Sequence, residues 1–508
     1  MKDMQNFILE NHMKKNNLYE VLETKTLSLI NNEISDIDIK LFFSKKDLLL
    51  FYTGNGNILT FSSKKQNFLN KIIPKNAKNS SINCLDITED LNELICGYQD
   101  GTIEIINLQG GETKYTNNKI HKGTSCIEIK IFKKEKSEIS FISSGHDGNV
   151  YYNTVKIGLT SILWRIKSTP ILTKISENPI YLIKIFDNYL NLGEKYVILG
   201  SIDEISIYCI EPCIEYLFSF KKPDYINASV VPDSHVGIGK ISLNDYSEDN
   251  KDNILLIISW ANIIYFYAIE TNEQKIINYY KEIGNFINEN EILRIGFINY
   301  SVIYIVDNTF SIKLIDTQKI NKGKIIVSKV DQRPIKPEKN NLAVIEQNHF
   351  ISPFLFSQLK IFDSEKNKIK TYLYSILENN FENNLSLYIL GSKQVYNIIL
   401  SDWKNYLNNF MKREDYLNLF SIGIKLYKNN FHALSNIPNY EKDREASQKK
   451  VREYLRQIIS QYVLINIDEK NNLESISQSI KLVIEFCIEI EDVEYLLNSI
   501  EPIFEEKK

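Results

Sequence analysis

The sequence lacks an excess of positive charge. Lysine and arginine number 60 against 64 aspartates and glutamates, and the formal net charge at pH 7 is −4. Proteins that bind nucleic acid neutralise its phosphates with clustered basic residues, so this balance gives no support to a nucleic-acid partner. The 508 residues, 43% hydrophobic and 24% charged, are otherwise typical of a globular protein of roughly two to four domains.

Cysteine is also scarce. The thin spread of the cysteines, mostly within apolar stretches, is typical of reduced thiols in a cytosolic protein and not of a disulfide framework. The six are Cys84, Cys96, Cys126, Cys209, Cys213 and Cys487. Cys209 and Cys213 have a spacing that zinc ligands permit, but no second pair follows them. We therefore expect no metal site.

Long apolar segments are absent too. The longest, Ile254–Ile269, is interrupted by Ser259-Trp260-Ala261-Asn262. It is short for a membrane span and predicts a strand, a turn and a second strand. The start of the chain, MKDMQNFILENHMKKNN, contains no apolar stretch of signal-peptide length. We expect a soluble, cytoplasmic protein whose membrane contacts are peripheral.

The motifs of common catalytic and cofactor sites are missing. The sequence contains no GxxxxGK[ST] phosphate loop, no GxGxxG that opens a helix, and no HExxH or GxSxG. Gly54-Asn55-Gly56 lies between two apolar runs with no helix after it, which predicts a hairpin turn and not a phosphate site. We expect no enzyme, no cofactor and no small-molecule substrate.

His146, in Ser-Gly-His-Asp-Gly, is the histidine that most resembles a catalytic residue, but no acid or cysteine is evidently placed to orient it. We interpret it as a polar residue beside a turn. Asp100 and Asp147 each precede a glycine, where a carboxylate hydrogen-bonds to the local backbone. The remaining histidines are scattered: His12, His121, His235, His349 and His432. Three lysine pairs are expected to be solvated faces: Lys133-Lys134, Lys221-Lys222 and Lys449-Lys450. The sequence assigns no partner-binding residue.

One unit recurs along the chain as far as Leu400: an apolar strand, a tight turn and a second apolar strand. Asn-Gly and Asp-Gly at the turns supply the positive φ that short hairpins need. Seven such hairpins occupy 47–63, 92–108, 138–155, 195–211, 254–270, 302–317 and 387–400. Paired strands that repeat about every 45 residues are typical of a β-propeller. The pattern predicts seven degenerate WD-like blades at 25–402, with insertions at 244–252 and 331–347. The long last interval leaves room for an eighth blade.

The apolar period changes after Leu400. Apolar residues then recur every three or four positions, which predicts helices, and Asp402 is placed to cap the first of them. The predicted helices are Trp403–Arg413, Asp415–Tyr427, Lys442–Leu464, Leu473–Glu489 and Val493–Ile500. Consecutive helices with short loops are typical of an α-solenoid, which we expect to begin at 403–508. Residues 1–24 are expected to be a polar tail.

Several stretches resemble the vacuolar protein sorting-associated protein 8 family, the large subunit of the endosomal CORVET tether. The junction between propeller and helices carries the resemblance in Leu390-Gly391-Ser392-Lys393, Ser401-Asp402-Trp403 and Leu426-Tyr427. Further similar stretches are Ile82–Asp86 with Gly97–Gly101, Ser144–Gly148, Ile210–Pro212 and Ile257–Asn262, in which Ala261 stands where the family has glycine. Their order and spacing extend the resemblance over about 80–500.

The resemblance implies a non-catalytic tethering subunit. It implies that the propeller binds a GTP-loaded early-endosomal Rab GTPase, that the solenoid joins core subunits of the tether, and that the protein lies peripherally on endosomal membranes. The family's long N-terminal extension and its C-terminal RING domain have no counterpart in these 508 residues. We therefore expect either a fragment or a shortened paralogue.

Two alternatives stay open at this point. One is a sister protein of the same architecture, either a subunit of the HOPS tether of late endosomes and vacuoles or a vesicle-coat subunit. The other is a WD-like scaffold that binds peptides or basic tails through its central channel. The second alternative predicts an acidic, aromatic-lined channel mouth.

Overall fold

The structure is a computed structural model. The residues that it describes are 22–136, 138–156, 165–173, 178–187, 194–201, 203–224, 235–242, 252–271, 277–297, 302–307, 311–321, 324–334, 343–344, 357–363, 368–381, 384–390, 395–431, 434, 436–438, 443–466 and 473–502. The predicted tail at 1–24, the insertions at 244–252 and 331–347, and the turn Gly391-Ser392-Lys393 lie wholly or largely outside the described residues. The chain divides into two compact units, one with the strands up to Ile399 and one with the helices after it.

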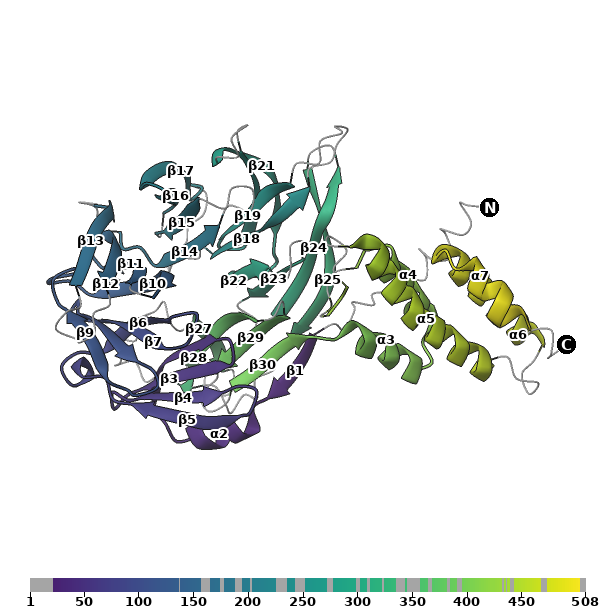
Figure 1. Ribbon diagram of the computed structural model, residues 1–508, viewed down its shortest axis with the longest axis horizontal. Helices are drawn as coiled ribbons and strands as arrows, with labels where there is room; N and C mark the ends of the chain where they lie inside the picture. Colours follow the sequence, from purple (N-terminus) through teal and green to yellow (C-terminus); the bar gives the residue numbers. More distant parts are fainter. Residues whose placement is uncertain are drawn as a thin grey trace. The chain divides into compact units, whose positions relative to one another are not determined.

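Six four-stranded antiparallel sheets follow one another along the chain, each with its strands in sequence order (Figure 1). The first three sheets consist of β2 (Ile39–Lys45), β3 (Leu48–Thr53), β4 (Ile58–Ser62) and β5 (Asn67–Ile72); β6 (Ile82–Ile87), β7 (Glu93–Tyr98), β8 (Ile103–Asn107) and β9 (Thr113–Asn117); and β10 (Cys126–Glu135), β11 (Glu138–Gly145), β12 (Val150–Lys156) and β13 (Arg165–Leu172). The next three consist of β14 (Leu182–Asp187), β15 (Lys195–Gly200), β16 (Glu204–Glu211) and β17 (Glu215–Lys221); β18 (His235–Ser242), β19 (Asp252–Trp260), β20 (Ile263–Thr271) and β21 (Ile277–Ile287); and β22 (Ile292–Phe297), β23 (Val302–Asp307), β24 (Ser311–Asn321) and β25 (Lys324–Pro334). This is the blade pattern of a β-propeller.

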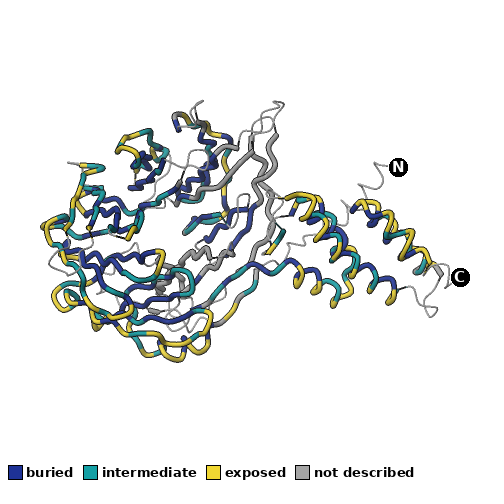
Figure 2. The backbone as a smooth tube through the Cα atoms, viewed as in Figure 1, coloured by how far each residue is buried: buried dark blue, intermediate teal, exposed yellow. Residues whose placement is uncertain are grey.

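The first six predicted hairpins are confirmed as the two middle strands of these six blades. All residues of β3 and β23 are buried, because a neighbouring sheet covers each face. The outer strand β5 is mostly exposed, and Figure 2 shows the same contrast between buried strands and exposed turns. Burial on both faces explains why the middle strands are continuous apolar runs and not alternating patterns.

The prediction of seven like blades is wrong, because the described residues form six four-stranded blades and a different last sheet. That sheet has six strands: β1 (Leu22–Thr26), β26 (Ala343–Val344), β27 (Ser357–Asp363), β28 (Lys368–Phe381), β29 (Asn384–Leu390) and β30 (Val395–Leu400). The seventh predicted hairpin is confirmed as β29 and β30, but a hairpin pattern cannot reveal how many further strands join it. Here β1, from the start of the chain, pairs with β30, the last strand.

A side chain that follows β1 in the sequence also forms hydrogen bonds with the backbone of β30. In the helix α2 (Ser28–Ile34), Asn31 accepts the backbone N–H of Val395 through Oδ1 at 2.7 Å. The Asn31 amide donates back to the Val395 carbonyl at 3.4 Å. Pairing of the two ends of the β unit closes the succession of sheets, and closure is how a propeller protects strand edges that would otherwise stay unpaired.

The hydrophobic core lies between neighbouring sheets. One cluster, for example, joins Leu50 and Ile58 of the first blade to Leu94 and Ile106 of the second. Comparable clusters join the second blade to the third, the third to the fourth, the fourth to the fifth, the fifth to the sixth, and the last sheet to the first blade. The first strands of neighbouring blades contact one another, so they form the inner ring of the propeller.

The turns between the second and third strands carry the backbone conformation that the sequence predicts. Gly56, Gly101 and Gly148 have φ of 82°, 82° and 78°. The corresponding turn of the fifth blade has an alanine, Ala261, at φ 51°. A side chain with Cβ costs about 1–2 kcal/mol in this region, because Cβ crowds the backbone.

Ala261→Gly is therefore expected to stabilise the fifth blade by about 0.5 kcal/mol, the relief of strain less the greater chain entropy of glycine in the unfolded state. Ala268→Gly makes the same chemical change within β20, where Ala268 is fully buried, and should destabilise by about 1–2 kcal/mol. Hydrogen exchange of peptides that cover β19 and β20 measures the change in stability for each variant. If both variants changed the stability in the same direction, Ala261 would not be strained.

The second unit is helical, as the change of period predicts. Its elements are α3 (Trp403–Lys412), α4 (Tyr416–Tyr427), α5 (Arg444–Asn466), α6 (Leu473–Glu489), α7 (Val493–Tyr495) and the π-helical turn η3 (Leu496–Ile500). The predicted cap is confirmed: Asp402 Oδ1 accepts the N–H groups of Lys404 and Asn405 at 3.0 and 3.2 Å. None of the described helices is long and apolar enough to cross a membrane.

These helices pack through aromatic and ionic contacts. The rings of Phe420 in α4 and Phe486 in α6 have centroids 4.5 Å apart. Arg456 in α5 makes two hydrogen bonds of 2.7 Å with the carboxylate of Asp492, which is buried just before α7. Each helix thus contacts others in the unit, but these few helices do not by themselves define a solenoid.

Candidate partner-binding face

Most of the turn residues considered as possible site residues lie on one face of the propeller. Because strands alternate in direction, the turn between the second and third strands of each blade lies at the same end as the segment that enters the blade. Backbone hydrogen bonds join the two in successive blades, from Gln99 N–H to the Ser81 carbonyl and from His146 N–H to the Ser125 carbonyl, both 2.9 Å. In the first three blades this end, which we call the loop face, consists of 35–38, 54–57, 73–81, 99–102, 118–125 and 146–149.

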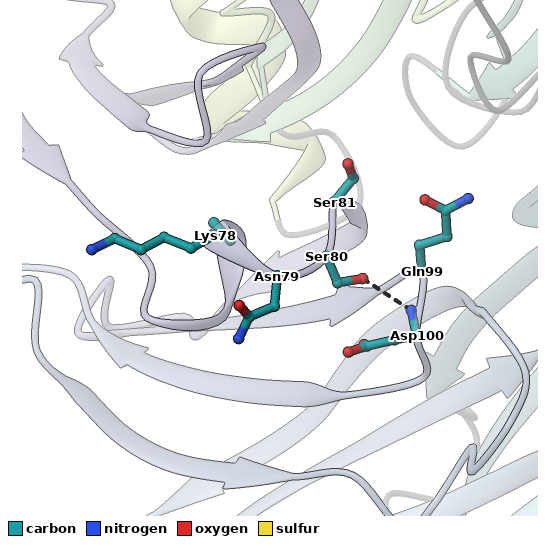
Figure 3. A pocket seen from close by; sticks show the side chains of 7 residues that line it. Lys78, Asn79, Ser80, Ser81, Gln99 and Asp100 are labelled. Carbon is teal, nitrogen blue, oxygen red and sulfur yellow. Dashed lines mark hydrogen bonds between the residues drawn. The ribbon is translucent and has the colours of Figure 1, made fainter.

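A polar pocket of about 420 Å³ opens on the loop face of the second blade (Figure 3). Its lining residues are Ala77, Lys78, Asn79, Ser80, Ser81, Gln99 and Asp100. The Ser80 hydroxyl accepts the Asp100 N–H at 3.1 Å, which joins the two sides of the pocket. In Figure 3 the Lys78 side chain extends away from Gln99. An open pocket with amide, hydroxyl and carboxylate groups suits polar groups of a partner surface.

A buried carboxylate holds one wall of this pocket. Glu104 in β8 has no exposed surface, and its two oxygens accept the backbone N–H groups of Lys75 and Asn76 at 3.2 and 3.3 Å. The hydroxyls of Tyr98 and Thr113 also donate to it. Burial raises the pKa of Tyr98, so its hydroxyl stays protonated and keeps donating. Glu104 therefore fixes the backbone from which the short 3₁₀ helix η1 (Asn76–Lys78) begins.

His121, on the next segment of the loop face, is also buried. Its Nε2 lies 2.9 Å from the Ser143 hydroxyl, which accepts from the Asn153 amide at 2.8 Å. Burial lowers the pKa of His121 to about 4, although the Asp147 carboxylate acts in the opposite direction. A neutral imidazole that is 1% exposed packs the third blade and is not accessible to a substrate.

The structure brings the turn residues singled out in the sequence onto the loop face. Gly54-Asn55-Gly56 forms the predicted turn between β3 and β4, and His146 is exposed beside its own turn. Asp100 accepts the Thr102 N–H at 3.0 Å and Asp147 accepts the Asn149 N–H at 3.1 Å. The predicted local role of both aspartates is thus confirmed.

The cysteines do not form a site. All six are free thiols. Cys209 is buried and its Sγ lies 3.0 Å from the Glu211 carbonyl, whereas Cys213 is exposed. Burial raises the pKa of Cys209 to about 11. Within the ranges that the structure describes, no three histidine, cysteine or acidic side chains come close enough to hold a metal ion.

Two lysine pairs depart in part from their prediction as solvated faces. In one of them Lys222 lies 3.0 Å from Asp203 and its side chain is only 18% exposed, whereas Lys221 is exposed. The other pair is Lys133-Lys134. Lys134 contacts Asp90 at 2.6 Å and also pairs with Glu93, and its side chain is only 18% exposed. Lys133 pairs with Glu211 at 2.9 Å. A lysine at the end of β10 reaches acidic groups of neighbouring blades, which sequence spacing alone does not reveal. Lys449 and Lys450 are exposed, as expected.

The inner ring carries charges of both signs. Glu128 and Lys130 of β10 lie 3.4 Å apart, and Asp86 of β6 is close enough to affect both. Partial enclosure raises the pKa of Glu128, and the positive charges of Lys130 and of Arg294 on β22 oppose this shift. The described charges of β6, β10 and β22 thus include basic groups, which does not favour the acidic, aromatic-lined channel mouth that the second alternative predicts.

Sequence reasoning missed the two residues that shape the loop face, Glu104 and His121. Glu104 interrupts the apolar run Ile103-Glu104-Ile105-Ile106, and a charge in such a run is the available signal. His121 had no such signal, because its partners come from β11 and β12.

Comparisons with known proteins found similar solved structures and one matching family. The chain is similar to the Cps50 (Swd1) β-propeller domain of Myceliophteria thermophila, with 11% identity and a TM-score of 0.43 over 74% of this chain and 99% of that one. It is also similar to a chain of the mitotic checkpoint complex, with 9% identity and a TM-score of 0.42 over 76% and 93%. No curated protein matches the chain. The Vps8 beta-propeller family matches residues 42–398, from the first blade into the six-stranded sheet, and the chain belongs to this family.

Proposed function

We propose that this chain is a non-catalytic tethering subunit in endosomal or vacuolar vesicle traffic. The propeller, residues 25–402, binds a GTP-loaded early-endosomal Rab GTPase, and the helices of 403–508 begin an α-solenoid that joins other tether subunits. The protein acts in the cytoplasm, peripherally on endosomal membranes through these partners. The observation that carries the proposal is the match of residues 42–398 to the Vps8 propeller family.

The local structure agrees with a binding role. A rigid ring of packed blades presents loops at one end, and binding residues are commonly found on loops held by such a scaffold. A standard interface buries about 800 Å² on each partner.

The proposal is tested by capture of Rab GTPases on the purified chain. We expect an early-endosomal Rab loaded with a GTP analogue to bind, and the same Rab loaded with GDP to bind at least 10-fold more weakly, because the switch segments differ between the two states. A late-endosomal Rab serves as the matched control. Exclusive capture of the late Rab would favour a HOPS-type subunit, and capture of neither Rab by a folded sample would contradict the proposed Rab function.

A further inference from the structure

Four exposed lysines lie on the two loop-face segments that border the second blade. Lys75 and Lys78 belong to 73–81, and Lys119 and Lys122 belong to 118–125. Among the residues that the structure describes, no carboxylate oxygen lies within 4.0 Å of any of these four amino groups. Four positive charges on adjacent segments are therefore left without an ion-pair partner inside the described part of this chain.

At the opposite end of the same blades, lysines form ion pairs with acidic side chains. There Lys45 lies 2.9 Å from Glu89 of the second blade, and Lys134 of the third blade lies 2.6 Å from Asp90. These lysines neutralise acids of the neighbouring blade and so connect the blades to one another. The loop-face lysines make no such connection among the described residues, which leaves them available to a partner.

The pocket of Figure 3 lies between the two lysine-bearing segments. Lys78 is one of its lining residues, and on the other side the Ser125 hydroxyl donates to the Gln99 carbonyl at 2.7 Å. That bond joins the segment of Lys119 and Lys122 to the turn that lines the pocket. Glu104 fixes the Lys75 end from beneath. Hydrogen bonds therefore hold the two lysine-bearing segments and the pocket in one arrangement. We call the surface formed by the four lysines and the pocket the lysine surface.

We propose that the lysine surface is where an acidic protein surface docks. The inference rests on the proposed function, in which the partner is the GTP-loaded Rab. Positive charge on the two segments attracts carboxylates and accelerates association. Asp100 lines the pocket and is exposed, so its carboxylate can accept from a partner group that donates, such as an amide or ammonium. A protein loop supplies both kinds of group and can enter a recess, whereas a phosphate-rich bilayer is flat and repels Asp100.

The test reverses charge on the lysine surface. The variant Lys78→Glu/Lys122→Glu changes one exposed lysine on each segment. The matched control Lys64→Glu/Lys65→Glu changes two exposed lysines on the turn after β4, at the opposite end of the propeller. Both variants alter net charge equally and neither removes an ion pair among the described residues, so both should keep the thermal midpoint of the wild type. The probe is an early-endosomal Rab loaded with a GTP analogue, titrated at 50 and 200 mM salt.

We expect the Lys78/Lys122 variant to lose at least 10-fold in affinity at 50 mM salt, less at 200 mM because salt screens the charges, and the control to lose less than 2-fold. Equal binding by wild type and variant overturns the lysine surface and leaves the Rab proposal standing. Absence of binding by the wild type overturns both. Vesicles of phosphatidylcholine and phosphatidylserine, mixed four to one, form a separate arm. If the variant loses vesicle binding but keeps the Rab, the lysine surface contacts membrane and the inference is wrong.

Discussion

Replacement of Glu104 by alanine should destabilise the second blade by about 3 kcal/mol. The substitution removes the acceptor of four hydrogen bonds, from the hydroxyls of Tyr98 and Thr113 and from two backbone N–H groups. Each buried donor left without an acceptor costs about 1–3 kcal/mol, and water entering the vacated space offsets part of the sum. Hydrogen exchange of peptides that cover β7, β8 and residues 73–81 measures the loss where it occurs.

Two variants separate this effect from a general loss of negative charge. Glu112→Ala removes a carboxylate from the same blade, but that side chain is 61% exposed and pairs only with Lys114 there, so we expect a change below about 0.5 kcal/mol. Glu104→Gln keeps one acceptor oxygen and most of the volume, and should lie between the two. If Glu104→Ala and Glu112→Ala had equal effects, Glu104 would not be the support of the pocket wall.

The same change should reach the partner surface. Glu104 accepts the N–H groups of Lys75 and Asn76 through separate oxygens, so Glu104→Gln keeps one acceptor and loosens the segment that carries Lys75 and Lys78. Rab binding by this variant, which should remain folded, is then expected to weaken by about 3-fold, because the loosened segment must be ordered on binding. The stability effect does not depend on this result. Hydrogen exchange tests whether Glu104 stabilises the blade, and the Rab titration tests whether the segment that it holds takes part in binding.

The middle strands of the blades are predictable from sequence because of how they are buried. Neighbouring sheets cover both faces of β3 and β23, so the chain must supply an unbroken apolar run followed by a turn residue such as Gly56. The outer strand β5 has no such constraint, and its exposed Phe68 and Leu69 form no pattern that marks a strand. The blade count failed for a different reason: β1 joins the last sheet from a distant part of the chain, which no local pattern reveals.

The candidate face was less predictable because its contacts join different repeats. Glu104 in an apolar strand resembles an outward-facing polar residue, but it is buried by Tyr98 and by the backbone at Lys75. The lysine surface joins two segments about one repeat apart, and only the packing of the second and third blades makes them neighbours. Local spacing therefore locates the turns, while the chemistry of the face requires the assembled fold.

A second large effect is expected in the sixth blade, where a lysine is buried. Lys313 of β24 is 2% exposed and its Nζ lies 3.2 Å from the Asp307 carboxylate, which has no exposed surface. The same nitrogen donates to the Asn288 amide oxygen at 2.7 Å. Lys313→Met leaves the Asp307 charge enclosed without this counter-charge. We expect a loss of about 3–5 kcal/mol, measured by hydrogen exchange of peptides from β23 and β24.

The double variant Asp307→Asn/Lys313→Met distinguishes a missing charge from a missing contact. It removes both charges. Asp307 accepts from Ser311 N–H through Oδ1 and from the Asn290 amide through Oδ2, both at 3.2 Å, and the single oxygen of an asparagine keeps one of these two hydrogen bonds. Because the desolvation cost of two ions is removed together with their attraction, the double variant should recover most of the stability and fall within about 1 kcal/mol of the wild type. If the double variant were as unstable as Lys313→Met, packing of the lysine stem and its bond to Asn288 would hold the blade, and the ion pair would be incidental.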